Sequence, residues 1–251
     1  MSETQETKLT NKYAEEFYDT YLQQLPEDYK NLRWFSSPER RLDYDQTRSV
    51  ITRAMRGGMV DRLLEVGPGD GVWTDIFIPH AKELVLLDQS EEMIKRAEKR
   101  FANNDAISFV HSDVAAYTAE RQFGAICAIR CFEYFEDKPA AINSFYKILE
   151  KNGTLVIVTK NPDHIRTKDV QTRNLHSDQI DRETMKQLLT NAGFEVTSVM
   201  SAVARIKTKY AVMRVLSRLV HKLHVITGGV VTIPRLNHLF TESYIYVAKK
   251  R

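Results

Sequence analysis

The sequence has few cysteines and no apolar run long enough to cross a bilayer. Cys127 and Cys131 are the only two cysteines among 251 residues, too few for a disulfide framework or a tetrahedral cysteine site, so we expect reduced thiols and no metal. No apolar segment approaches the ~18–20 residues of a transmembrane helix. Residues 1–6 are polar and lack the apolar core of a signal peptide. Together these features predict a cytoplasmic protein.

Neither sign of charge dominates the whole chain, but acidic residues are missing from one segment. The net charge of +3 is too small to favour a nucleic-acid partner. From Val196 to Thr241 there is no Asp or Glu. The same segment carries basic residues throughout: Arg205, Lys207, Lys209, Arg214, Arg218, Lys222 and Arg235.

Within the acid-free segment, residues 207–224 are amphipathic at the period of a helix. One predicted face is apolar and comprises Val212, Met213, Leu216, Leu219, Val220 and Leu223. The other is polar and mostly basic, with Arg214, Ser217, Arg218, His221 and Lys222. Two interpretations remain open. The helix either packs on the sheet with a solvated basic face, or contacts an anionic acceptor, an anionic lipid surface or nucleic acid.

Glycine is sparse, with 10 residues in the chain, but three glycines stand at alternate positions: Gly67, Gly69 and Gly71. They follow the apolar run 63–66, and glycine there lets the backbone turn sharply and approach a ligand closely. Residues 72–77 can begin a helix whose free N–H groups face the same ligand. A second apolar run, 84–87, ends in Asp88. This order of strand, turn, helix and acid-tipped strand predicts a nucleoside-binding half-sheet.

The spacing of the glycines distinguishes among nucleotide-binding motifs. A phosphate-binding P-loop needs a Gly-Lys-Ser/Thr ending, and no lysine follows these glycines before Lys82. The dinucleotide-binding motif has its third glycine three positions after the second, where this chain has Val72. With Glu65 two residues before the first glycine, the motif reads E-x-G-x-G-x-G. It resembles motif I of the class I S-adenosylmethionine-dependent methyltransferases, in particular their type 11/25-like domains.

The resemblance covers roughly residues 60–200 and implies a role for each acid that ends a strand. Asp88 would accept hydrogen bonds from both ribose hydroxyls, and Met93 would pack on the adenine face. Asp113 would lie near the adenine amino group, with the backbone N–H of Val114 beside a ring nitrogen. The implied cofactor is S-adenosyl-L-methionine, and the implied binding set is Glu65, Gly67, Gly69, Gly71, Asp88, Gln89, Met93, Asp113, Val114 and Arg130.

The loop after the fourth predicted strand, residues 130–135, is expected to flank the methionine moiety and the transferring methyl. Many members of the family have a histidine where this chain has Tyr134. Arg130 either pairs with the methionine carboxylate or is a structural arginine satisfied by Glu133 or Asp137. Asp70, between the glycines, is expected to be a solvent-side turn residue.

The resemblance implies an α/β fold, a doubly wound, seven-stranded Rossmann-like methyltransferase sheet. Its last strand, near 243–248, would run antiparallel beside the fifth. Ahead of the sheet, apolar spacing, a Ser-Pro helix start and a Gly-Gly stop predict a helical cap. The expected division is a disordered lead (1–12), the N-terminal helical cap (13–57) and the methyltransferase domain (58–251), with the basic amphipathic insert at 202–241.

Aromatic residues of the cap and of the loop after strand four are the candidate substrate pocket: Tyr13, Tyr18, Trp34, Phe35 and Tyr134. Transfer from a sulfonium depends mostly on positioning of the acceptor. A base is needed only where the acceptor must lose a proton, and His164 and His176 are the candidate catalytic bases.

The expected function is methyl transfer to O or N of a small-molecule acceptor, anionic or lipid-like. Two alternatives remain. One is a membrane-surface methyltransferase that reaches a lipid or prenylated acceptor through the basic insert. The other is a non-catalytic cofactor-binding subunit that activates a partner enzyme.

Overall fold

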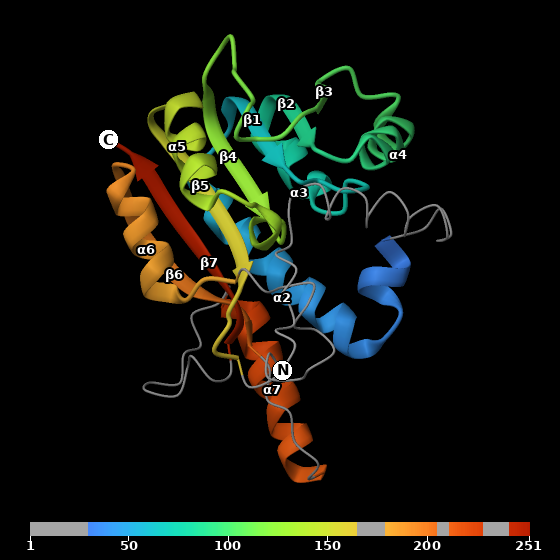
Figure 1. The fold of residues 1–251 in the computed structure, drawn as a ribbon. Coiled ribbons are helices and arrows are strands. Elements are labelled where there is room, and N and C mark those ends of the chain that lie inside the picture. Colours follow the sequence, from blue (N-terminus) through green and yellow to red (C-terminus); the bar gives the residue numbers. More distant parts are fainter. Residues whose placement is uncertain (1–29, 165–178, 205–210, 228–240) are drawn as a thin grey trace, which may run out of the picture.

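The computed structural model describes residues 30–164, 179–204, 211–227 and 241–251, and of 211–218 it describes the backbone alone. These residues form one sheet flanked by helices (Figure 1). The strands are β1 (Val60–Val66), β2 (Ala81–Asp88), β3 (Ile107–His111), β4 (Phe123–Ile129), β5 (Leu149–Lys160), β6 (Phe194–Ala204) and β7 (Thr241–Lys250). The longer helices are α2 (Pro38–Ala54), α4 (Glu91–Phe101), α5 (Lys138–Ile148), α6 (Arg182–Asn191) and α7 (Ala211–Thr227). The short helical turns are η1 (Asn31–Phe35), η2 (Met55–Gly57), α3 (Thr74–Phe77), η3 (Ile78–His80) and η4 (Phe132–Tyr134).

The seven strands lie in the order β3-β2-β1-β4-β5-β7-β6. Strand β7 runs antiparallel to both of its neighbours, β5 and β6, while the pairs among β1 to β5 are parallel. The expected doubly wound sheet with an antiparallel last strand is thus confirmed. The chain leaves β1 toward β2 and later returns to the other side of β1 with β4. Such a reversal opens a crevice at the carboxyl ends of the strands.

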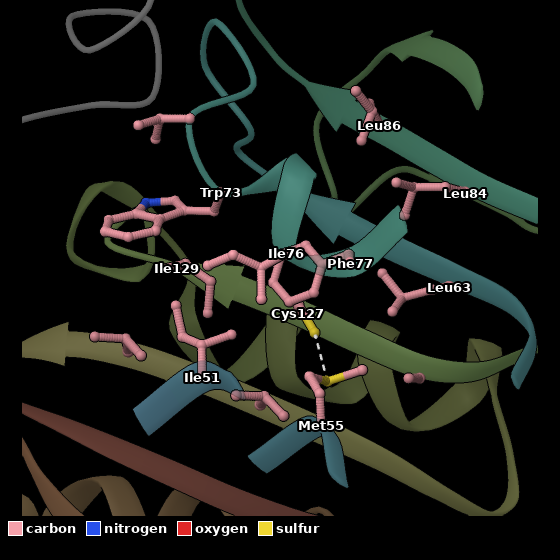
Figure 2. Packing of buried hydrophobic residues seen from close by; sticks show 14 of the residues in the cluster. Ile51, Met55, Leu63, Trp73, Ile76, Phe77, Leu84, Leu86, Cys127 and Ile129 are labelled. Carbon is pink, nitrogen blue, oxygen red and sulfur yellow. Dashed lines mark hydrogen bonds between the residues drawn. The ribbon is translucent and has the colours of Figure 1, made fainter. Parts of the chain in front are cut away.

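Apolar cores cover both faces of the sheet, as the nearly continuous apolar runs of the strands require. On one face α2, α3 and α4 pack over the strands, and on the other α5 and α6 do so. Figure 2 shows the first core, in which Ile51 and Met55 approach Trp73, Phe77 and Cys127. Cys127 is buried and Cys131 half-buried, both are free thiols, and burial raises the pKa of each.

The cap helix α2 forms where its end signals predict. The side chain of Ser37 accepts a hydrogen bond from the backbone N–H of Arg40 at 3.2 Å, and Pro38 takes the first helical position. The helix gives way to η2 just before Gly58. The helix expected near residues 13–25, and the disordered lead before it, lie outside the described residues.

The helix expected to begin within residues 72–77 is present but short. Helix α3 spans four residues, Thr74–Phe77, and continues as the 3₁₀ turn η3, which contains Pro79. Proline lacks an N–H and clashes with the preceding turn, so an α-helix cannot continue through it. Helix α3 is therefore a single turn.

The start and orientation of the insert differ from the expectation. Strand β6 continues through Ala204 and pairs with β7, so residues 202–204 belong to the sheet. In α7, His221 and His224 are buried at 8% and 0% exposure, and Nε2 of His224 lies 3.3 Å from the carbonyl oxygen of Ala202. Leu219 and Leu223, from the face expected to pack inward, are 59% and 50% exposed. Polar side chains of α7 therefore face the end of β6, and part of the apolar face is turned outward.

Candidate functional site

A cleft opens at the carboxyl ends of β1, β2 and β4, where the strand order reverses. The empty space between its walls is about 1010 Å³, with the open solvent at its mouth included. The loops after β1, β2, β3 and β4 form its floor and walls, and η1 covers one side. Residues far apart in the sequence are thereby brought to one place.

The glycine turn after β1 forms the floor of the cleft. Gly67, Gly69 and Gly71 have φ of +63°, +59° and +81°, a region that residues with a Cβ enter only with strain. A Cβ at Gly67 would lie 2.5 Å from Cβ of Cys131, and one at Gly71 would lie 2.3 Å from the ring of Phe101. Glycine at these two positions is therefore needed for packing within the protein. Gly69 is different, because nothing in contact with its Cβ position is closer than Sδ of Met93 at 3.8 Å.

Asp88, at the end of β2, holds two loops together. Its Oδ2 accepts from the backbone N–H of Gly69 at 3.1 Å, and its Oδ1 accepts from the N–H of Ser90 at 3.0 Å. Each carboxylate oxygen can accept more than one hydrogen bond. A half-buried carboxylate fixed in this way is a suitable acceptor for two neighbouring hydroxyl groups.

The loops after β2 and β3 form the next part of the wall. Ser90 caps α4 by accepting from the N–H of Met93 at 3.2 Å, and Met93 is buried in the wall of the cleft. Oδ1 of Asp113 accepts from the N–H of Ala115 at 2.8 Å, which fixes the turn after β3. Gln89, Asp113 and the buried Val114 all line the cleft here.

Arg130 follows β4 and enters the cleft with an unusual backbone, φ +62°. Its partner is Glu242, which lies immediately before Ser243 on β7. The guanidinium donates to the two carboxylate oxygens at 2.7 and 3.2 Å and also to the hydroxyl of Ser243. Of the two interpretations from sequence, the structural one matches this pairing, but its partner is neither of the two acids expected. The Nε of Arg130 is buried and makes no hydrogen bond within the described part of the chain.

Aromatic rings close the cleft on the side of η1. Trp34 is buried, and its ring centroid lies 4.9 Å from that of Trp73, which stacks in turn on Tyr44 at 4.9 Å. The guanidinium carbon of Arg130 lies 5.8 Å from the ring centre of Trp34. Trp34 and Tyr134 are therefore in the wall as expected, whereas Phe35 packs against Tyr44 outside it.

A model of a methyltransferase domain matches residues 13–199. The chain belongs to this family. Its fold and motif place it among the class I S-adenosylmethionine-dependent methyltransferases, so its cofactor is S-adenosyl-L-methionine.

Similar proteins include Nodulation protein S of Sinorhizobium fredii, 26% identical over 124 residues, or 46% of this chain and 57% of that protein. Malonyl-[acyl-carrier protein] O-methyltransferase of Priestia megaterium is 30% identical over 100 residues, 39% of this chain and 36% of that protein. The chain thus spans about half or less of the length of these relatives. The N-methyltransferase NodS of Bradyrhizobium japonicum WM9 in complex with S-adenosyl-L-homocysteine superposes with a TM-score of 0.62 at 17% identity, covering 93% of this chain and 97% of that one. At this identity the superposition shows the fold.

The residues of the cleft fit the cofactor. Asp88 offers two acceptor oxygens, Gly69 leaves open space beside Met93, and Asp113 and Val114 line the same cleft. The acidic residues predicted at the ends of two strands, Asp88 and Asp113, therefore line one cleft.

Two acidic residues lie where the sequence did not predict. Glu65 is 1% exposed and outside the cleft wall, where Thr74 Oγ1 donates to its Oε2 at 2.7 Å. Burial raises its pKa to about 8. Asp70 was expected on the solvent side, but it is 8% exposed and lines the cleft, with its Oδ2 accepting from the backbone N–H of Lys30 at 3.0 Å. It is buried because the segment before α2 folds over the glycine turn.

Few candidates remain for acid–base chemistry in the described cleft. His164 is 2% exposed, in the loop after β5, and is not part of the cleft wall. His176, Tyr13 and Tyr18 lie outside the described residues. Sequence reasoning missed Glu133, which is 4% exposed, lines the cleft and accepts from Thr159 Oγ1 at 3.2 Å. Its position directly after β4 was the available signal.

Among the described residues, no three His, Cys, Asp or Glu side chains gather as a metal site would require. No helix there has both the length and the apolar character needed to cross a bilayer.

Proposed function

We propose that this protein transfers the methyl group of S-adenosylmethionine to an oxygen or nitrogen of a small-molecule acceptor. The observation that carries this proposal is the continuity of the cleft. Asp88 and Asp113, which we expect to hold the nucleoside, line the same cleft as Trp34, Glu133 and Tyr134, which would wall a second end. A second end of this kind provides room for an acceptor beside the cofactor.

The chain's own residues would act mainly by positioning. The bound sulfonium supplies an electrophilic methyl group, and a displacement of this type gains most from holding the reacting atoms in line. The rings of Trp34 and Tyr134 exclude water from one side of an acceptor. Glu133 stands where it can hold a protonated amine or an acidic hydroxyl by a hydrogen bond.

The chemical character of the acceptor follows from the charges at this end. Arg33 and Arg130 line the cleft. The other two nitrogens of the Arg130 guanidinium pair with Glu242, which fixes the orientation of its buried Nε–H. Lys160 lies close by, and burial together with the charge of Arg130 lowers its pKa to about 8. An oxygen-rich group could accept from the Nε–H of Arg130, whose charge Glu242 already balances, and an anionic group would complement Arg33.

A second candidate function is methyl transfer at a membrane surface to a lipid or prenylated acceptor. The exposed leucines of α7 favour this candidate, since they are the kind of side chains that enter a lipid interface. The relatives named above also act on different acceptors, so the family by itself does not select between the two.

The test is a transfer assay with purified protein, cofactor labelled in the methyl group, and separate pools of amines, phenols, carboxylic acids and lipid vesicles. Label in one pool is expected, and it should be lost in Asp88→Ala but not in the exposed control Asp105→Ala. Tight binding of S-adenosylhomocysteine with no transfer to any pool would contradict an enzyme. It would favour a cofactor-binding subunit that activates a partner.

A further inference from the structure

Helix α7 carries a row of exposed apolar side chains. Six large apolar side chains are at least 36% exposed in the described part of the chain, and three of them are on this helix. They are Leu219 at 59%, Leu223 at 50% and Ile226 at 80%. With 3.6 residues per turn, these positions fall within about 60° of the helix circumference. They form one stripe on the outer side of α7.

The opposite side of α7 is anchored to the protein, so the helix cannot turn this stripe inward. His221 and His224 are buried there beside the end of β6, and burial lowers the pKa of both, which keeps them neutral at pH 7. Arg53 of α2 donates to the carbonyl oxygen of Thr227 at 2.6 Å at the end of the helix. Figure 1 shows α7 extending from the sheet at the end away from the C-terminus.

Positive charge accompanies the stripe. Lys222 is exposed next to the stripe and lies between Leu219 and Leu223 in the sequence, and Arg214 and Arg218 precede it in the sequence. No acidic residue occurs from Val196 to Thr241. An apolar stripe flanked by cations is the pattern of helices that lie in the interface of an anionic bilayer.

We propose that α7 docks this methyltransferase onto an anionic lipid surface. Leu219, Leu223 and Ile226 enter the boundary between headgroups and acyl chains, and Lys222 lies at the level of the phosphates. The charge of the segment selects this occupant, because a second copy of the same helix would bring cations against cations. The inference names the surface for the membrane-based candidate above. The inference concerns lipid binding alone. Lipid binding can therefore be disproved while methyl transfer is found, and methyl transfer can be disproved while lipid binding is found.

The test is sedimentation with vesicles of phosphatidylcholine, with and without phosphatidylglycerol. The wild type is expected to sediment with the mixed vesicles and to do so less as salt rises. The double variant L223S/I226S should lower the partition coefficient about tenfold or more, because two apolar side chains no longer enter the interface. Met59→Ser removes a 62% exposed side chain elsewhere and is the matched control, expected to bind like the wild type.

Charge is tested separately. Lys222→Glu should weaken binding about fivefold or more, whereas Lys151→Glu, at an exposed position on β5, should not. Unchanged affinity for S-adenosylhomocysteine in every variant shows that the fold is intact. Equal sedimentation of L223S/I226S and the wild type, or no sedimentation of the wild type with anionic vesicles, overturns the proposal. So does a wild-type dimer that L223S/I226S abolishes while vesicle binding is unaffected.

Discussion

The carboxylate of Asp88 accepts a hydrogen bond from the backbone N–H of Gly69 over 3.1 Å. This contact joins the end of β2 to the middle of the glycine turn after β1. Because the other oxygen of Asp88 accepts from Ser90, one side chain sets the spacing between the floor of the cleft and the start of α4. The same carboxylate thus organises the loops and faces the proposed position of the ribose.

Asp88→Ala is expected to weaken binding of S-adenosylhomocysteine by about 1–3 kcal/mol, because the ribose hydroxyls and two backbone N–H groups lose their acceptor. The affinity of Asp88→Asn should fall between those of Asp88→Ala and the wild type, since an amide offers one acceptor oxygen in place of two. Titration calorimetry measures both. Affinity unchanged in Asp88→Ala, with the melting temperature preserved, would remove Asp88 from the cofactor site.

The glycines of the turn should respond differently to alanine. At Gly67 a Cβ meets the Cβ of Cys131 at 2.5 Å, and the backbone has φ +63°. The clash is therefore with the protein itself. At Gly69 a Cβ makes only ordinary contact with Met93 at 3.8 Å. Gly67→Ala should lose far more stability than Gly69→Ala, which pays mainly the roughly 1–2 kcal/mol of a left-handed backbone.

Chemical denaturation of the two alanine variants measures this difference. Gly69→Ala should fold and yet bind S-adenosylhomocysteine more weakly, since its Cβ projects beside the cleft. Equal stability of the two variants would show that Cys131 does not restrict position 67.

Glu65 should make folding less favourable as pH rises. Burial raises its folded pKa to about 8, from the ordinary value of 4.5. Between these values the unfolded chain releases the proton while the folded chain keeps it, so stability falls by up to roughly 1.4 kcal/mol per pH unit. Glu65→Gln removes this dependence and should gain stability over the wild type from about pH 5 to pH 8.

Denaturant titrations of Glu65→Gln across this range provide the measurement. Glu98→Gln, at an exposed position of α4, serves as the control and should follow the wild-type profile. If the profiles of Glu65→Gln and the wild type run parallel, Glu65 is ionised in the folded protein.

The pair of Arg130 and Glu242 should make the protein less stable as pH falls, the opposite of the effect of Glu65. Burial by itself raises the pKa of Glu242, but the charge and hydrogen bonds of Arg130 outweigh it and hold the pKa well below the ordinary value of 4.5. Its contribution to stability is therefore present above about pH 4.5 and is lost as pH falls toward the folded pKa.

Glu242→Gln leaves the buried guanidinium without its counter-charge and should cost about 3–5 kcal/mol at pH 7. The double variant R130Q/E242Q removes both charges and should recover part of that loss. Thermal melts at neutral and acidic pH measure both effects. A loss in Glu242→Gln that is additive with that of Arg130→Gln would mean that the two side chains do not stabilise each other.

Local sequence determined the elements of the nucleotide half-sheet. The alternate glycines permit positive φ whatever surrounds them, and an apolar run that ends in an acid places that acid at the carboxyl end of a strand. Parallel strands then bring Asp88 and Asp113 to one edge. The cap helix α2 was equally predictable, because its N-cap, proline and terminal glycines act within a few residues.

Tertiary structure alone decided the partners of the buried charges and the orientation of α7. Arg130 and Glu242 are 112 residues apart, and no local pattern distinguishes Glu242 from nearer acids. Asp70 is buried only because Lys30 and its neighbours fold over it. For α7, helical periodicity defines which residues share a face. Periodicity cannot define which face meets the protein. That depends on the end of β6, where buried backbone groups need hydrogen-bond partners that leucine side chains cannot provide.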